Sequence, residues 1–147
     1  MADLIPVLQT AIGPMILISG IGLLLLTMTN RLGRAIDRAR LIGSQVPQSD
    51  VASRAALEAQ LRILWRRARL VRTAIALSAV SALAAALIVI LIFFTAVLGI
   101  RTAWLVASLF TACMLSLIAS LMLFIHDINQ SLAALRLELR AHGLDDV

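Results

Sequence analysis

Apolar residues gather in three long blocks, 4–28, 73–100 and 103–125, and none of the three contains Lys, Arg, Asp or Glu. A helix needs about 20 predominantly apolar residues to cross the hydrocarbon core of a bilayer, which is about 30 Å thick. Each block is long enough, and too few polar residues remain to cover three such blocks as the core of a soluble protein. The pattern therefore predicts an all-α membrane protein with transmembrane helices at about 4–29, 73–98 and 103–125.

The first block differs from the others because it contains Gly13 and Pro14. Proline is tolerated in the first turn of a helix but disrupts the interior, where its missing N–H removes a hydrogen bond. Two arrangements remain open: a helix from Leu4 that kinks at 13–14, or a short re-entrant or interfacial piece at 3–12 followed by a span that starts at Pro14. In either form we expect a kink or a break at 13–14.

Beyond each span, apolar residues keep a helical spacing and predict extensions at about 30–42, 51–72 and 126–141. In the first extension, arginines spaced i, i+3, i+7 form one stripe, and apolar residues form the opposite stripe. The second and third extensions carry apolar residues at alternating spacings of three and four, the heptad pattern of a coiled coil. These seams are Leu57, Leu61, Leu64, Ala68, Val71 and Ile75 in the second extension, and Ile125, Ile128, Leu132, Leu135 and Leu139 in the third. We expect the extensions to pack as a cytoplasmic helical bundle, with helices lying on the lipid surface as the alternative.

Charge predicts the orientation of the chain. All 13 basic residues are arginine, and ten of them lie in segment 30–72 against three acidic residues, a net charge of +7, whereas the loop 99–102 has one arginine. The positive side of a membrane protein faces the cytoplasm, so we expect the N-terminus outside and both segment 30–72 and the C-terminus inside. Each basic residue near a membrane surface contributes about 1 kcal/mol of attraction to anionic headgroups. The candidate contacts with anionic lipid are Arg62, Arg66, Arg69 and Arg72.

One face of the first helix is small and polar along its length. Small residues let membrane helices approach closely, and polar side chains in a span face a neighbouring helix or a water-filled path. The face comprises Ser19, Gly20, Thr27, Asn30, Arg31, Arg34, Asp37 and Arg38. Small-residue faces on all three spans predict a homo-oligomer. One hypothesis for the face of the first helix is an ion-conducting pore whose cytoplasmic mouth is ringed by the arginines, which would favour anions. The alternative hypothesis is a membrane-anchored scaffold whose basic cytoplasmic helices bind anionic lipid or a partner protein.

Residues suited to catalysis or metal binding are scarce. The chain has one cysteine, Cys113, and two histidines, His126 and His142, and no set of His, Cys, Asp and Glu has the spacing of metal ligands. His126 and Asp127 are adjacent, so their side chains point in different directions on a helix, and we interpret the pair as the end of the third span. Aromatic residues are 4% of the chain and Tyr is absent, so stacking platforms for nucleic acid are missing. We expect no enzymatic activity, cofactor, metal or nucleic-acid partner.

A resemblance rests on the stretch from Pro14 to Arg40, which reads PMILISGIGLLLLTMTNRLGRAIDRAR. This stretch resembles a bacterial membrane-protein family named domain of unknown function 2721, and the three-span plan of the whole chain is loosely similar to it. The resemblance implies a bacterial inner-membrane protein and implies no activity, ligand or catalytic residue. The matching positions are Pro14, Ser19, Gly20, Gly22, Asn30, Arg31, Arg34, Asp37 and Arg38.

Overall fold

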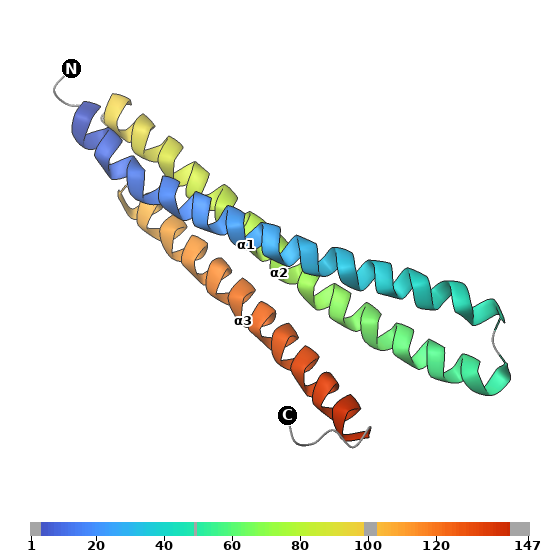
Figure 1. Ribbon diagram of the computed structural model, residues 1–147. Coiled ribbons are helices and arrows are strands. Elements are labelled where there is room, and N and C mark those ends of the chain that lie inside the picture. The colour runs from blue at the N-terminus through green and yellow to red at the C-terminus, as the bar shows by residue number, and fades with distance from the viewer. Residues whose placement is uncertain (1–3, 49, 99–102, 142–147) are drawn as a thin grey trace.

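The computed structural model describes residues 4–48, 50–98 and 103–141, and within these ranges the chain forms three long α-helices and no strand. Helix α1 spans Leu4–Gln45, a short 3-10 helix η1 follows at Val46–Gln48, helix α2 spans Val51–Leu98, and helix α3 spans Ala103–Ala141 (Figure 1). All three α-helices are long and apolar enough to cross a membrane. The predicted class, an all-α protein with three helices able to span a membrane, is confirmed.

Helix α1 runs without interruption through Gly13 and Pro14. In a membrane a break would leave several backbone groups without hydrogen-bond partners, whereas proline within a continuous helix removes only one bond. Of the two arrangements that the sequence leaves open, the structure has the helix that begins at Leu4. A break at 13–14, the second form of that prediction, is therefore wrong.

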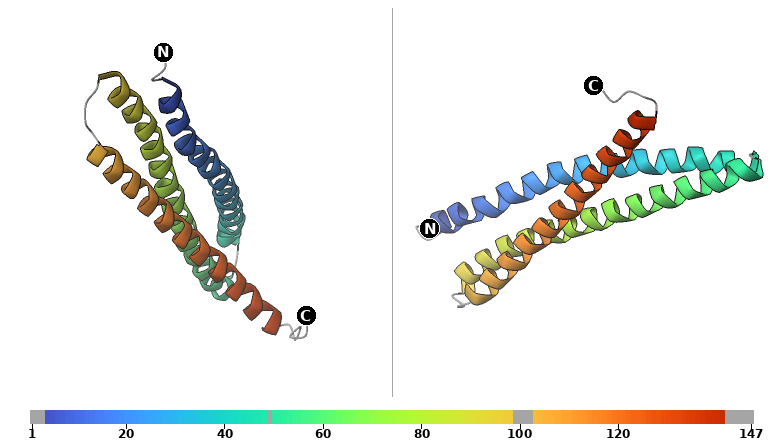
Figure 2. Two further views of the ribbon diagram at one scale, coloured as in Figure 1. Left: turned by 90° about the vertical axis from the view of Figure 1, so that its left-hand side faces the viewer. Right: turned by 90° about the horizontal axis from the view of Figure 1, so that it is seen from below.

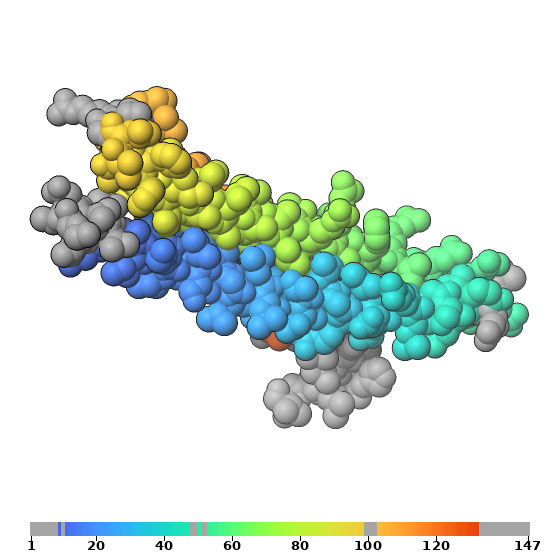
Figure 3. Space-filling model, turned by 90° about the horizontal axis from the view of Figure 1, so that it is seen from above, coloured from blue at the N-terminus to red at the C-terminus, as the bar shows by residue number. Residues whose placement is uncertain are grey.

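The three helices run in alternating directions. The start of α1, the end of α2 and the start of α3 lie at one end of the molecule, and the α1–α2 connection lies at the other (Figure 1). Helix α2 is central because it packs against both α1 and α3. Figure 3 shows α1 and α2 side by side along one face, and Figure 2 shows α3 diverging from this pair toward its C-terminal end.

Beyond their apolar halves, α1 and α2 continue together as the arginine-rich hairpin, residues 30–72. The seam predicted on α2 is turned inward, because Leu57, Leu61, Leu64 and Ala68 are half-buried and Val71 is buried. The seam predicted on α3 is described only in part: Leu132 is 52% exposed, and the side chains of Leu135 and Leu139 lie outside the described residues. The structure thus shows a two-helix hairpin, and the three-helix cytoplasmic bundle stays a prediction.

Small polar side chains join α2 and α3 in the apolar half. Ser120 Oγ donates to the carbonyl of Ala74 at 2.6 Å and lies 2.7 Å from Ser78 Oγ. Ser81 Oγ donates to the carbonyl of Cys113 at 3.0 Å, and Cys113 Sγ donates to the carbonyl of Ser81 at 3.2 Å. Small side chains let the two backbones come close enough for these bonds. We call these five buried residues the serine seam.

The outside of the apolar half is covered by large apolar side chains. Ile16, Leu23, Leu83, Phe93 and Leu115 are each more than half exposed. Such a surface would be unfavourable in water, but it matches a hydrocarbon solvent. Together with three helices long enough to span, it describes a multi-pass membrane protein.

Candidate functional site

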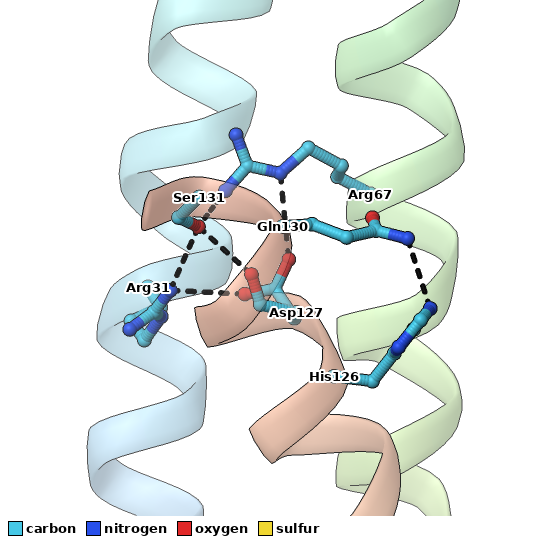
Figure 4. A network of polar contacts seen from close by, with 6 residues as sticks. All are labelled: Arg31, Arg67, His126, Asp127, Gln130 and Ser131. Atoms are coloured by element: carbon cyan, nitrogen blue, oxygen red, sulfur yellow. Dashed lines mark hydrogen bonds and ion pairs between the residues drawn. The ribbon is translucent and has the colours of Figure 1, made fainter. Parts of the chain in front are cut away.

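Asp127 on α3 is buried where the three helices meet, with 2% of its surface exposed. Its Oδ2 accepts a hydrogen bond from Arg31 Nη2 of α1 at 3.0 Å, and its Oδ1 lies 3.5 Å from Arg67 Nε of α2. Figure 4 shows the side chains of Arg31 and Arg67 reaching this carboxylate from two different helices. A buried charge is costly unless it is paired, and here one carboxylate is paired with two guanidinium groups.

Ser131 and Phe124 lie about one turn on either side of Asp127 and hold the arginines in place. Ser131 Oγ donates to the carbonyl of Asp127 at 2.9 Å and accepts from Arg31 Nη2 at 3.3 Å. Arg67 Nη2 also donates to Ser131 Oγ. The guanidinium carbon of Arg31 lies 5.4 Å from the centroid of the Phe124 ring, a cation–π contact. We call Arg31, Arg67, Asp127 and Ser131 the ion cluster.

Helical spacing places the ion cluster at the end of the apolar packing. Ser120 and Asp127 are both buried and lie seven residues apart, so Asp127 continues the α3 side of the serine seam. On α1, Arg31 lies three residues after Met28, which is fully buried. On α2, Arg67 lies seven residues before the serine seam begins. On each helix, the face that packs through apolar and small residues therefore continues into the residues of the ion cluster.

A pocket of about 220 Å³ opens beside the ion cluster. It is lined by Arg31, Arg34, Ala35, Arg38, Leu64, Arg67, Val71 and Asp127, and we call it the arginine pocket. Four arginines and one aspartate give its lining a net charge of +3. Arg34 and Arg38 are exposed, and no ion pair with another described residue involves either of them. The arginine pocket therefore presents uncompensated positive charge.

A larger groove of about 870 Å³ lies between α1 and α2 of the hairpin. Its apolar lining is Leu32, Ala35, Ile36, Ala39, Leu61, Leu64, Trp65 and Ala68, and its charged lining is Arg40, Glu58, Arg62, Arg69 and Arg72. We call it the apolar groove. It shares Ala35 and Leu64 with the arginine pocket but none of the arginines. The arginine stripe predicted on the first extension thus lines the arginine pocket, and the apolar stripe lines the apolar groove.

The structure divides the small polar face predicted on α1. Ser19, Gly20, Thr27, Asn30 and Asp37 are exposed on this helix. Arg31 instead pairs with Asp127, and Arg34 and Arg38 line the arginine pocket. Of the predicted lipid contacts, Arg62, Arg69 and Arg72 line the apolar groove, whereas Arg66 is exposed outside both sites.

Sequence reasoning missed the roles of Arg67, Asp127 and Ser131. His126 is exposed and its Nε2 lies 2.9 Å from Gln130 Nε2 (Figure 4), so it does point away from its neighbour Asp127. Asp127 is in addition a structural hub that joins the three helices, a role that sequence reasoning did not indicate. The seven-residue spacing of small and polar residues on the third block was the signal that could have found it.

Anion binding and apolar contact are the chemistry that these sites offer. Among the described residues, no group of three or more His, Cys, Asp and Glu could hold a metal ion. The carboxylate of Asp127 is engaged by two arginines, so it is poorly placed to act as a free base. The arginine pocket presents guanidinium groups suited to an anion, and the apolar groove presents a surface suited to apolar side chains.

Three spanning helices, an apolar exterior and a buried ion cluster at the end of the apolar packing define a multi-pass α-helical membrane protein with a charged junction. Residues 11–137 match the family described as Protein of unknown function (DUF2721), and the chain belongs to this family. The resemblance seen over 14–40 is thereby confirmed over most of the chain. No curated protein and no solved structure matched it.

Proposed function

We propose that this protein is a membrane-anchored scaffold of the bacterial inner membrane, with its N-terminus outside and its arginine-rich hairpin and C-terminus in the cytoplasm. The apolar groove carries the proposal. Within it, Trp65 is 70% exposed and Ile36 is 39% exposed. Contiguous apolar surface on a part of a protein that faces water marks an interaction site. The activity proposed is therefore binding, with no enzymatic step.

An acidic amphipathic helix of a partner protein fits the apolar groove. From Glu58 to Arg72 the groove follows α2 for about 21 Å, which is about four turns of helix. An amphipathic helix binds such a groove through apolar residues spaced i, i+3 or i+4, and i+7. Four arginines against one glutamate give the groove a net charge of +3, so acidic residues beside the partner's apolar stripe would be attracted. Tryptophan and arginine are also the residue types most enriched in binding hot spots.

Lipid and a second copy of the chain are less suitable occupants. The headgroup layer of a bilayer is about 5–8 Å thick on each side. With the hairpin upright, that layer covers only the end of the groove near Arg69 and Arg72. A second hairpin carries a net charge of +7 and would be repelled by the first.

Photo-crosslinking in living cells tests the proposed partner. A photoreactive phenylalanine analogue at Leu61 is expected to crosslink to one protein, at a segment that mass spectrometry identifies as an acidic amphipathic helix. Arg69→Glu is expected to lower the crosslinking yield about tenfold, because an attraction of about 1 kcal/mol is replaced by repulsion. Arg66→Glu makes the same charge change outside the groove and is expected to leave the yield unchanged.

The matched probe position is Ile63, which is 61% exposed on the same helix but does not line the groove. Crosslinking is expected at Leu61 and not at Ile63. Crosslinks at Leu61 to lipid, to a second copy of the chain, or to a segment without acidic residues would contradict the proposal.

Assembly as a homo-oligomer is the second candidate function, and the exposed small face of α1 favours it. An added Cβ at Gly20 would meet no atom within 4 Å, so packing within one chain does not require this glycine. Glycine in a helix costs about 1 kcal/mol relative to alanine, and small residues let a neighbouring membrane helix approach. Thr27 and Asn30 are also exposed. An arginine-ringed pore is less well supported, because Arg31 is paired with Asp127 and like-charged hairpins oppose a tight ring.

Gly20→Leu is expected to convert an oligomer into single chains in lipid nanodiscs, measured as particle mass, while the helical circular dichroism stays unchanged. The larger side chain would hold neighbouring helices apart without contacting its own chain. Gly22→Leu is the control, because two helical residues turn it about 200° away from Gly20 and its added Cβ also meets no atom within 4 Å. A wild-type protein that is already a single chain would contradict the assembly and leave the groove proposal standing.

A further inference from the structure

We propose that the arginine pocket is a binding site for a phosphate group, carried either by a lipid headgroup or by a free solute. The pocket shares no arginine with the apolar groove, so a phosphate bound here does not depend on the partner proposed above. Its lining carries four guanidinium groups and one carboxylate, a net charge of +3. The planar, always charged guanidinium group binds phosphate oxygens as a two-pronged fork.

Asp127 positions two of the four arginines. It is paired with Arg31 at 3.0 Å and with Arg67 at 3.5 Å, and Ser131 accepts from both. Each guanidinium group has five N–H donors, and these contacts engage only some of them. Arg31 and Arg67 are therefore held in place with donors to spare, which lowers the entropy lost when an anion binds.

The contact between Arg67 and Asp127 is a buried ion pair that lacks hydrogen-bond geometry at Nε and Oδ1. Within the described part of the chain, Arg67 Nε and Asp127 Oδ1 have no hydrogen-bond partner, although they lie 3.5 Å apart as an ion pair. Most buried polar atoms in folded proteins are hydrogen-bonded, so an exception needs an explanation. Here the explanation is the ion pair itself, because each atom faces the other with almost no accessible surface, and a phosphate would bind the remaining N–H donors of Arg67.

Arg34 and Arg38 form the accessible side of the arginine pocket. Both are exposed, whereas the side chains of Arg31 and Arg67 are 26% and 27% exposed. The two exposed guanidinium groups of Arg34 and Arg38 can therefore contact an anion whose other oxygens meet Arg31 and Arg67.

The inner end of the arginine pocket, at Arg31 and Asp127, lies at the level of lipid headgroups, so a lipid is one source of the phosphate. Arg31 lies three residues after the last residue of the first apolar block, and Asp127 lies two residues after the last residue of the third. These distances are about 3–5 Å along a helix axis, which falls within the headgroup layer of about 5–8 Å. A free phosphate-bearing solute could reach the same place from the water side.

Two probes separate the sources. Inorganic phosphate is titrated calorimetrically against the full chain in phosphatidylcholine nanodiscs at constant ionic strength, with sodium chloride as the reference titration. Separately, retention of phosphatidylglycerol by the full chain is counted by native mass spectrometry from mixed nanodiscs. We expect saturable binding of at least one probe, and the probe that binds identifies the source.

Arg34→Gln/Arg38→Gln is expected to weaken that binding at least tenfold. Arg54→Gln/Arg66→Gln removes the same charge from exposed positions outside both sites and is expected to weaken it less than twofold. Equal losses in the two double variants would show attraction by net charge alone and overturn the site. Binding of neither probe by the wild type, or a chloride titration equal to that of phosphate, would also overturn it.

Discussion

Asp127→Asn is expected to lower the free energy of unfolding by about 3 kcal/mol. Removing one partner from a buried ion pair costs about 3–5 kcal/mol, because the other charge is left buried without compensation. Arg31 and Arg67 are 26% and 27% exposed and can reach water in part, which places the loss at the lower end of that range. Asparagine keeps the volume of aspartate, so no cavity contributes. Helical circular dichroism during a denaturant titration in detergent micelles measures the loss.

The triple variant Arg31→Gln/Arg67→Gln/Asp127→Asn tests whether the stability lost in Asp127→Asn comes from the arginines left unpaired or from the altered side chain at 127. With no charge left in the ion cluster, more than half of the lost stability is expected to return. The control is Asp37→Asn, an exposed aspartate on α1, with an expected change within about 0.5 kcal/mol. A loss at Asp127 no larger than the loss at Asp37 would mean that the ion cluster contributes little to stability.

The helices of the fold could be predicted because the signal for each of them is long and local. Three uncharged apolar blocks predict three spans wherever they occur in a chain, and the heptad seam from Leu57 to Val71 predicts an inward face of α2. Pro14 left two arrangements open because proline argues for a break in water, whereas in hydrocarbon the cost of exposing backbone favours a continuous helix. The apolar stripe of the first extension and the two heptad seams likewise predict a bundle, but they do not specify the angle between the helices, and α3 diverges from the hairpin (Figure 2).

The candidate site was predicted only in part, because it depends on how the helices are rotated against one another. The stripe of Arg31, Arg34 and Arg38 was recognised, but the sequence alone does not show whether it faces a symmetry axis or a pocket within the chain. The structure turns it toward Asp127. Sequence reasoning also followed small residues spaced by four, whereas the buried ones on α2, Ala74, Ser78 and Ser81, alternate spacings of four and three. On α3 the buried residues Cys113, Ser120 and Asp127 are spaced by seven, and that spacing leads to Asp127.

The arginine-rich hairpin thus carries two kinds of surface on one pair of helices. The arginine pocket collects Arg31, Arg34, Arg38 and Arg67 around one buried carboxylate, and the apolar groove has its own arginines at its edges. Ala35 and Leu64 line both sites. The two sites therefore share apolar lining but no charged residue.

Ser120→Leu is expected to lower the free energy of unfolding by about 3 kcal/mol through the packing of α2 against α3. Ser120 is fully buried, and its Oγ lies 2.6 Å from the carbonyl of Ala74 and 2.7 Å from Ser78 Oγ. A leucine there must push the two backbones apart, which costs about 1–3 kcal/mol. The variant also loses interhelical hydrogen bonds worth about 0.6–2 kcal/mol each in membrane proteins. The denaturant titration used for Asp127 measures this loss.

Ser108→Leu is the matched control, because Ser108 is exposed on the same helix and its Oγ donates only to the Leu105 carbonyl of its own helix, at 3.0 Å. Its expected change is within about 0.5 kcal/mol. Ser120 lies two turns before Asp127 on one buried face, so separation of α2 and α3 at Ser120 should also pull Arg67 away from Asp127. The double variant Ser120→Leu/Asp127→Asn is therefore expected to lose at least 0.5 kcal/mol less than the sum of the two single losses. Strictly additive losses would show that the serine seam stabilises the helices without positioning the ion cluster.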